Sequence, residues 1–374
     1  MSNGRKAVLV YNTARYLLRF RSELIVQLQR EGFEVVALVP MKDSAVVGLE
    51  RMGVRCEDLD VMGQGMNPLK DLLLLIALWR RFKKERPHIV CLFTIKPVIF
   101  GSIAARWAGV PKAYSMITGL GYVFSGEGKA RRVLRQLVVY LYRFSLKSNR
   151  KVFFQNQDDI VMFRRLELVE ETQVCRINGS GVDLNVFKPS GSMRQPRAFI
   201  LIARMIKEKG ILEFAAAAKL VKAANPEVEF WLVGEIDRNP SAVSPDLIGS
   251  WESAGYVRYL GHVNDVPSLY AESIAFVLPT YYREGIPRTI LEAMACGLPI
   301  ITTDTPGCRE AVVDGVSGFL VEPKNVGQLA ERMSRFLDNG ELRSKMGAES
   351  RRIAEERYDV DSVTNKIMAA LLNQ

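Results

Sequence analysis

Residues 274–302 read IAFVLPTYYREGIPRTILEAMACGLPIIT, which predicts a strand, a loop, a helix and a second strand in succession. The apolar run over 274–278 is typical of a buried strand. Pro287 suits the first turn of a helix, where its missing N–H costs nothing. Gly297 is a typical residue just past a helix end, and 299–302 predicts the next strand. The stretch therefore predicts a βαβ unit with parallel strands.

The same alternation of short apolar runs and helical patterns extends over the whole chain. Six strands are predicted in each half, over residues 7–10, 34–39, 89–94, 113–117, 152–155, 174–178, 199–203, 229–234, 257–260, 274–278, 299–302 and 318–321. Two sets of six predict two Rossmann-like, doubly wound parallel sheets. A polar stretch at 187–196 separates them. We therefore expect an N-terminal domain at 1–188, a C-terminal domain at 197–357, and a helix within 358–374 that can return to the N-terminal domain.

Composition is that of a soluble globular protein, with 48% hydrophobic and 25% charged residues among 374. The longest apolar run, Leu72–Trp79, is too short to span a bilayer, and we expect no secretory signal from residues 1–6. Five cysteines are scattered without C-x-x-C spacing. This pattern disfavours a disulfide framework or a zinc site and suits a reducing, cytoplasmic compartment.

The net charge of +10 is unevenly distributed. Residues 1–189 carry 30 Lys and Arg against 17 Asp and Glu, a balance of +13, and the rest carry 21 against 24, a balance of −3. The N-terminal half therefore faces an anionic partner. Nucleic acid, a phosphorylated substrate and an anionic membrane surface all fit this charge.

The loop and helix start at 284–292 suit a diphosphate. Backbone N–H groups at a helix N-terminus bind anions, and residues 285–290 supply them here. The donors are Gly285, Ile286, Arg288, Thr289 and Ile290, while Pro287 lies in the same segment without an N–H. Glu284 and Glu292 flank this segment and can accept hydrogen bonds from sugar hydroxyls on either side of a diphosphate. The alternative interpretation is that Glu284 is an ordinary surface-loop glutamate and Glu292 an ordinary helix-face glutamate, without a role in binding.

Two cations follow another strand end in the C-terminal half. Arg204 ends the strand at 199–203, and Lys209 opens the next helix. Ligands bind at strand ends in α/β folds. Arg204 can clamp phosphate oxygens with two N–H groups, while Lys209 adds a point charge. Gly234 and Glu235, at the end of the strand over 229–234, are expected at the same site.

These motifs resemble glycosyltransferase family 4. The resemblance rests on residues 204–210, 284–292, 292–299, 314–315 and 318–321. It implies a GT-B fold, with two domains facing across a cleft, retention of anomeric configuration, and no catalytic metal or cofactor. By this resemblance Glu284 contacts the donor sugar, Glu292 contacts the ribose, and Arg204 with Lys209 neutralises the leaving diphosphate.

The N-terminal half resembles a narrower group, bacterial enzymes that extend undecaprenyl-diphosphate-linked sugars in glycan assembly. The matching segments of the N-terminal half are 93–97 and 118–124, and segments 283–289 and 306–310 of the C-terminal half point the same way. The resemblance implies a UDP-sugar donor, with N-acetylgalactosamine or a related HexNAc or hexose as the sugar. The residues expected at the acceptor diphosphate are Asn12, Arg15, Lys96, Gly119, Leu120 and Gly121.

The sequence departs from the wider family in its first loop and its histidines. Residues 11–16 lack glycine, and His88 and His262 are the only histidines. His88 precedes a strand in a Pro-His-Ile-Val pattern, which predicts a structural role for it. His262 has two readings, contact with the nucleotide or donor sugar, and a surface-loop role. A front-face mechanism, in which the departing phosphate takes the acceptor proton, needs no histidine base.

Residues 128–157 form a basic amphipathic segment with no acid before Asp158. Its apolar residues recur at helical spacing, at Leu134, Leu137, Val138, Leu141 and Phe144. Its first cations, expected at an anionic membrane, are Lys129, Arg131, Arg132 and Arg135. We expect the apolar stripe to be mostly core and the basic face to hold the protein on the cytoplasmic face of the inner membrane. An ordinary packed helix is the alternative.

Two other function classes compete with this reading. A GT-B epimerase would share the donor site but would not need a basic acceptor face. A nucleic-acid-binding protein would explain the charge, yet the sequence has no helix-turn-helix, no RNP pattern and no strip of stacking aromatics. We therefore expect no nucleic-acid partner.

Overall fold

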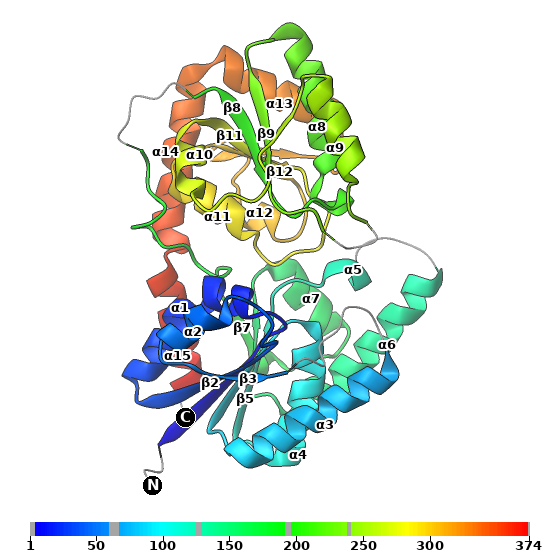
Figure 1. The fold of residues 1–374 in the computed structure, drawn as a ribbon, viewed down its shortest axis with the longest axis vertical. Helices are drawn as coiled ribbons and strands as arrows, with labels where there is room; N and C mark the ends of the chain where they lie inside the picture. Colours follow the sequence, from blue (N-terminus) through cyan, green and yellow to red (C-terminus); the bar gives the residue numbers. More distant parts are fainter. Residues whose placement is uncertain (1–3, 60–66, 125–128, 191–195, 238–240, 373–374) are drawn as a thin grey trace. The chain divides into compact units, whose positions relative to one another are not determined.

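The computed structural model describes residues 4–59, 67–124, 129–190, 196–237 and 241–372, except for the side chains of 122, 123 and 129–131. The chain forms two compact units, one of Met1–Ser180 with Asp361–Gln374 and one of Gly181–Val360. Each unit contains one parallel sheet with helices on both faces (Figure 1). The two predicted Rossmann-like sheets are confirmed.

The sheet of the first unit has the order β3-β2-β1-β4-β5-β6-β7, with all pairs parallel. Its strands are β1 (Arg5–Val10), β2 (Phe33–Val39), β3 (Arg55–Asp58), β4 (Ile89–Phe93), β5 (Lys112–Ile117), β6 (Lys151–Phe154) and β7 (Val174–Arg176). The order reverses between β1 and β4. Ligands of open α/β sheets bind beside such a reversal, at the carboxyl ends of the strands.

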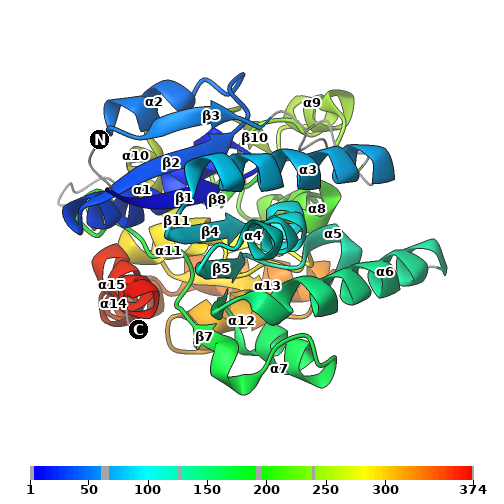
Figure 2. The same cartoon turned by 90° about the horizontal axis from the view of Figure 1, so that it is seen from below.

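Helices cover both faces of this sheet and enclose a hydrophobic core on each (Figure 2). One face carries α1 (Ala14–Arg30), α2 (Val46–Arg51) and α15 (Val360–Leu372). The other carries α3 (Pro68–Glu85), the π-helix η1 (Pro97–Gly101), α4 (Ser102–Ala108), α6 (Lys129–Ser145) and α7 (Gln157–Arg165). The short α5 (Gly121–Phe124) precedes α6.

The last helix, α15, completes the core of the first unit. Ile367 and Leu371 are buried among side chains of α1 and the sheet. The Tyr114 hydroxyl donates to the Leu371 carbonyl oxygen at 3.1 Å, and Gln27 Nε2 donates to Asn365 Oδ1 at 3.0 Å. The two ends of the chain thus contribute to one core.

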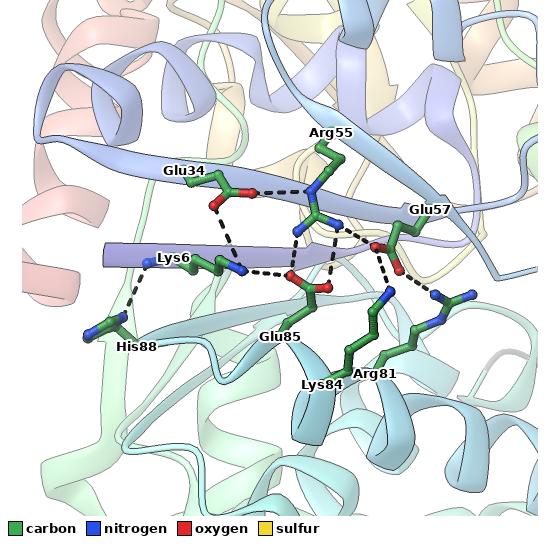
Figure 3. A network of polar contacts seen from close by, with 8 residues as sticks. All are labelled: Lys6, Glu34, Arg55, Glu57, Arg81, Lys84, Glu85 and His88. Atoms are coloured by element: carbon green, nitrogen blue, oxygen red, sulfur yellow. Dashed lines mark hydrogen bonds and ion pairs between the residues drawn. The ribbon is translucent and has the colours of Figure 1, made fainter. Parts of the chain in front are cut away.

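Strand β3 is a seventh strand that the sequence analysis missed. Its sequence, RCED, lacks the β-branched run that predicts a strand, because its charges serve an ion-pair network instead (Figure 3). Arg55 pairs with Glu34 at 3.1 Å and also with Glu57 and Glu85, while Lys6 Nζ lies 3.1 Å from Glu85. Burial acts to raise the pKa of Glu85, but the hydrogen bonds from Arg55 and Lys6 outweigh it and lower that pKa.

The sheet of the second unit has the order β10-β9-β8-β11-β12-β13, again all parallel. Its strands are β8 (Ala198–Ile202), β9 (Glu229–Val233), β10 (Arg258–Tyr259), β11 (Ser273–Leu278), β12 (Ile300–Thr303) and β13 (Gly318–Val321). Its helices are α8 (Ile211–Ala224), α9 (Pro245–Ser253), α10 (Val266–Ala271), α11 (Arg288–Ala295), α12 (Cys308–Ala311), α13 (Val326–Asp338) and α14 (Gly340–Arg357). One large hydrophobic core joins them.

The units divide at positions other than the predicted boundaries of 188/197 and 357/358. The chain enters the second unit at Gly181, because Val182 and Phe187 are buried in its core. The Val182 N–H donates to the Tyr358 carbonyl oxygen at 2.7 Å, and the Val360 N–H donates back to Val182 at 3.1 Å. The polar stretch predicted as a linker therefore begins inside the second unit. Within the described ranges, no helix is both long and apolar enough to span a bilayer.

Candidate active site

The predicted donor residues lie at the carboxyl ends of neighbouring strands. Strands β8 and β11 are adjacent in the sheet, so the loops that follow them meet. The loop after β8 carries Arg204 and Lys209, and the loop after β11 carries Glu284 ahead of α11. The order of strands reverses between β8 and β11, which is where open α/β sheets bind ligands.

Lys209 and Glu284 form an ion pair at the centre of these loops. Lys209 Nζ lies 2.5 Å from Glu284 Oε1, and the two side chains are 12% and 17% exposed. Because water screens partly buried charges poorly, this contact is stronger than a surface pair. The ammonium also lies 5.9 Å from the centre of the Tyr282 ring. The pair joins the residue expected at the leaving diphosphate to the residue expected at the donor sugar.

Gly210 allows the two loops to approach each other. Its φ of 77° is left-handed, and a Cβ there would lie 2.3 Å from the Pro279 carbonyl oxygen. Any other residue would force the loops apart. The Thr280 hydroxyl adds a direct link by donating to the Glu208 carbonyl oxygen at 2.9 Å.

Pro287, expected in the first turn of a helix, lies directly before α11. Pro287 is the N-cap with extended backbone, and the helix begins at Arg288. The Ile290 N–H donates to the Pro287 carbonyl oxygen at 3.1 Å, so this expected anion donor is already engaged. The side chains of Ile286 and Ile290 are buried in the core. The Thr289 carbonyl oxygen accepts from Tyr270 at 3.2 Å.

A second close approach fixes the loop before α11. A Cβ on Gly307 would lie 1.5 Å from the Gly285 carbonyl oxygen, and Gly307 has a φ of 86°. The loop after β12 therefore rests directly on Gly285. This contact defines the backbone path from Glu284 into the helix.

Glu292 is buried, unlike an ordinary helix-face glutamate. Its side chain is 1% exposed, and its Oε1 lies 3.2 Å from Nε of Arg288 one turn earlier. The Arg288 side chain is the more exposed member of the pair. Of the two, Arg288 is therefore the side chain more accessible to a ligand at the helix start.

Arg204 has a partner that the sequence analysis did not name. Its Nη1 lies 2.8 Å from Asp237 Oδ2, and the Arg204 side chain is partly exposed. Asp237 follows β9, the strand beside β8. A polar residue just past a strand end was the available signal for it.

The other predicted donor residues lie on the loops after β9 and β10. A Cβ on Gly234 would lie 1.9 Å from the Ala203 carbonyl oxygen, so glycine is required where these strand ends converge. His262 follows Gly261, and its Nδ1 lies 3.8 Å from Glu235 Oε1. His262 and Glu235 are both about half exposed.

Two other titratable groups near the ion pair remain neutral at physiological pH. Burial raises the pKa of Tyr281 to about 12, and the carboxylates of Glu213 and Glu208 add to the effect. Burial raises the pKa of Cys308 to about 11. Neither group therefore supplies a base or a thiolate here.

The predicted acceptor residues follow adjacent strands of the first unit. Asn12 lies after β1, Lys96 after β4, and Gly119 and Gly121 after β5. Since these strands are neighbours, their carboxyl ends share one edge of the sheet. Lys96 Nζ lies 2.8 Å from Asp71 Oδ1.

Three details qualify the acceptor set. Leu120 is fully buried, so only its backbone can face a ligand. The backbone N–H of Arg15 donates to Asp43 Oδ2 at 3.0 Å, while the side chain of Arg15 is exposed. Asp71, in the first turn of α3, was not predicted, because it lies directly before the apolar run Leu72–Trp79 and gave little signal of its own.

Helix α6 is less buried than expected. Val138 lies in the core and Leu134 and Leu141 are partly buried, but Leu137 and Phe144 are exposed. The expectation that its apolar stripe is mostly core is therefore wrong for the outer part of the stripe.

The basic residues expected at the membrane begin the same helix. Arg132 and Arg135 are exposed, and the side chains of Lys129 and Arg131 lie outside the described residues. In the part of the chain with described side chains, no group of three or more His, Cys, Asp or Glu is arranged to hold a metal ion.

Comparison with known families accounts for most of the chain. Residues 19–177 match the glycosyl transferase 4-like domain, and residues 184–353 match the glycosyl transferases group 1. The two matches fall on the two units of the structure. The Lys209–Glu284 site lies within the group 1 match.

Two similar proteins of established name align with most of this chain. The chain is 28% identical over 365 residues to the N,N'-diacetylbacillosaminyl-diphospho-undecaprenol alpha-1,3-N-acetylgalactosaminyltransferase of Campylobacter jejuni, covering 94% of each chain. It is 29% identical to the Escherichia coli UDP-Gal:alpha-D-GlcNAc-diphosphoundecaprenol alpha-1,3-galactosyltransferase, covering 76% of each.

Solved structures share the fold. Anabaena Alr3699/HepE in complex with UDP and glucose superposes with a TM-score of 0.79 at 20% identity, covering 99% of this chain and 100% of that one. Sucrose-phosphate synthase from Thermosynechococcus elongatus gives 0.79 at 16% identity, covering 97% of each. The chain therefore belongs to the GT-B glycosyltransferases that combine a glycosyl transferase 4-like domain with a group 1 domain.

Proposed function

We propose that this glycosyltransferase moves a sugar from a UDP-sugar to an undecaprenyl-diphosphate-linked saccharide, with retention of anomeric configuration. Both curated relatives carry diphospho-undecaprenol acceptors in their names, which supports the acceptor class. The UDP complex of the Anabaena neighbour supports the nucleotide. N-acetylgalactosamine is the first choice of sugar because the relative with 94% coverage transfers it, and galactose is the second.

The Lys209–Glu284 pair is the observation that carries the proposal. It holds a cation and a carboxylate within 2.5 Å of each other at the strand ends where ligands of this sheet type bind. Lys209 stabilises negative charge on the departing diphosphate, and Glu284 accepts hydrogen bonds from donor-sugar hydroxyls.

The chemical step needs no separate base. The bond from the anomeric carbon to the phosphate oxygen breaks, and the acceptor hydroxyl oxygen bonds to that carbon on the same face. The hydroxyl proton passes to the departing phosphate oxygen. Tyr281 and Cys308, both neutral near pH 7, fit a site that uses the leaving group in this way.

Transfer assays test the proposal directly. A screen of UDP-sugars with a lipid-linked acceptor, followed by product mass, should give one preferred donor and a product heavier by one sugar in the butanol-extractable lipid. The anomeric configuration of that product follows from NMR coupling constants. Release of UDP with no change in the lipid would contradict the acceptor, and epimerised UDP-sugar would indicate a different reaction.

We also propose that activity is independent of divalent metal. Arg204, Lys209 and the start of α11 supply the positive charge that a metal would otherwise provide. Activity should be unchanged in EDTA, and Arg204→Ala should lower kcat by an amount corresponding to about 2–4 kcal/mol, as for other donors to a developing anion. Loss of activity in chelator that Mn²⁺ restores would contradict this.

Peripheral attachment to the cytoplasmic face of the inner membrane completes the proposal. Helices α3, α4 and α6 cover one face of the first sheet, with α4 between the other two (Figure 2). Large apolar side chains are exposed on all three helices, at Leu69, Leu72, Leu73, Trp107, Val133, Leu137, Tyr140 and Phe144. Arg132 and Arg135 lie beside them, and the Arg106 guanidinium lies 5.8 Å from the centre of the Phe144 ring. Exposed apolar side chains among arginines complement an anionic bilayer surface.

A further inference from the structure

Thr280 lies next to Glu284 of the candidate site's ion pair and is completely buried. It is the second residue after β11, and the Thr303 hydroxyl of the neighbouring strand β12 donates to its carbonyl oxygen. The Thr305 hydroxyl approaches the same oxygen at 3.5 Å. The Thr280 backbone is therefore fixed to β12, which leaves its side chain to act between loops.

The Thr280 hydroxyl contacts both loops of the site. It donates to the Glu208 carbonyl oxygen at 2.9 Å and lies 3.4 Å from Glu284 Oε1. It accepts the Tyr282 N–H at 3.1 Å. A hydroxyl has one hydrogen and two acceptor lone pairs, so its proton is shared between Glu208 and Glu284 with the shorter contact dominant.

The Glu208 carbonyl oxygen is a second point of convergence. Besides the Thr280 hydroxyl, it accepts the Tyr281 N–H at 2.9 Å and shares the Tyr282 N–H with the Thr280 hydroxyl oxygen, each at 3.1 Å. Glu208 immediately precedes Lys209. The loop that carries Lys209 is thus fixed to the loop that carries Glu284 through one carbonyl group and one hydroxyl group.

We propose that Thr280 is a positioning residue that sets Lys209 and Glu284 relative to each other for sugar transfer. This inference rests on the proposed function of those two side chains. Thr280 reaches Lys209 through the Glu208 carbonyl and reaches Glu284 directly. Lys209 and Thr280 both approach Oε1 of Glu284, so together they orient the carboxylate from one side.

The test replaces the hydroxyl without changing the shape of the side chain. Thr280→Val should lower kcat roughly 10-fold or more, the scale for losing a hydrogen bond to a charged group, and should change the donor KM little. Thr280→Ser, which keeps the hydroxyl, should return kcat to within about 3-fold of wild type. Thr280→Ala serves the same purpose if the valine variant does not fold.

A matched control separates positioning from packing. Thr302 is also fully buried, and its hydroxyl donates to the Leu278 carbonyl oxygen at 2.7 Å without contacting either loop. Thr302→Val should lower the melting temperature as Thr280→Val does but leave kcat near wild type. Equal kcat losses in both valine variants, or no rescue by serine, would overturn the inference and indicate a structural role.

Glu284→Gln distinguishes failure of the inference from failure of the proposed function. If Glu284→Gln lowers kcat and Thr280→Val does not, the inference about Thr280 is wrong and the site stands. If both retain wild-type kcat, the proposed function of the Lys209–Glu284 site is wrong. Loss of kcat in both, with rescue by serine, supports the inference.

Discussion

At the scale of single residues, the two glutamates of the site differ in their surroundings. Glu284 is partly exposed and paired with Lys209, whereas Glu292 is buried and paired with Arg288. The sequence placed them on either side of the expected diphosphate segment, Glu284 in the loop and Glu292 in the helix, but it could not show that Lys209 is the partner of Glu284. That contact depends on the adjacency of β8 and β11, which no local pattern encodes.

Charge removal at the two glutamates should have different kinetic effects. Glu284→Gln should chiefly lower kcat, roughly 10- to 100-fold, because a charge-assisted hydrogen bond contributes about 1.5–3 kcal/mol and sugar positioning matters most as the bond breaks. Glu292→Gln should chiefly raise the donor KM, because ribose contacts are equal in ground and transition states.

Steady-state kinetics over a range of donor concentrations measures both effects. Glu356→Gln, on the exposed side of α14, is the matched control and should behave as wild type. Since Glu292 is buried, its substitution can also lower stability. The kinetic constants of Glu292→Gln and wild type are therefore compared at equal concentrations of folded protein, determined by thermal melting. Wild-type constants in both variants would contradict the donor-site assignment.

At the scale of elements, α6 tests the membrane proposal. Each basic residue near an anionic surface contributes about 1 kcal/mol, so Arg132→Glu with Arg135→Glu should weaken vesicle binding by roughly 30-fold or more. Leu137→Ser with Tyr140→Ser should weaken binding by removing apolar insertion, and this loss should persist at high salt. Charge-dependent binding should fall with salt, because the Debye length shrinks to about 3 Å at 1 M.

Flotation with anionic and neutral liposomes, with and without salt, measures this binding. Lys219→Glu with Lys345→Glu makes the same charge change on the second unit and should bind as wild type. Transfer to a short water-soluble acceptor should survive in every variant. If the α6 variants float as well as wild type, this helix is not the membrane contact.

Strand β3 shows why some elements escape sequence patterns. Apolar runs revealed the other strands of the first sheet, but Arg55, Glu57 and Asp58 give β3 the appearance of a loop. Its pairing with β2 is stabilised by ion pairs to Glu34 and Glu85, residues distant in sequence. The four residues of β3 alone therefore do not predict a strand, because the partners that stabilise it lie on β2 and at the end of α3.

The same network predicts a pH-dependent stability. The pKa of Glu85 is lowered in the folded state, so its contribution to stability is present above the unfolded pKa of 4.5 and is lost as pH falls through the folded value. Glu85→Gln should therefore lower the free energy of unfolding at pH 7 by about 1–3 kcal/mol. The difference from wild type should shrink below pH 4.5.

Chemical denaturation between pH 3 and 8 measures this difference. Glu34→Gln is the matched control, because Glu34 contacts the same Arg55 from a more exposed position. An exposed pair contributes only about 0–1 kcal/mol, so the control should differ little from wild type. A Glu85→Gln difference that does not change with pH would contradict the assignment.

At the scale of the whole molecule, the sequence predicted two sheets and the return of the last helix to the N-terminal domain, but the two units divide at other residues than expected. The polar stretch at 187–196 looks like a linker, yet the chain enters the second unit at Gly181. A Cβ on Gly181 would lie 2.6 Å from Cα of Val360, where the chain leaves that unit. This pairing of segments far apart in sequence has no local signature.

Removal of residues 361–374 should affect one unit and spare the other. Val363, Ile367 and Leu371 fill the core between α1 and the first sheet, so truncation opens that core. Differential scanning calorimetry should show an early transition for the first unit and an unchanged one for the second. Hydrogen exchange should rise in α1 and β5. An unchanged first transition would mean that α15 adds little to this core.

The position of α15 also reverses the order in which a nascent chain can finish its two units. Domains usually complete their folding in the order of synthesis. Here the second unit needs only residues 181–360, while the first unit also needs residues 361–372, which are translated afterwards. Until then, the face of the first sheet that α15 covers is open to chaperones or to aggregation. The half that is made first is therefore the half whose core is completed last.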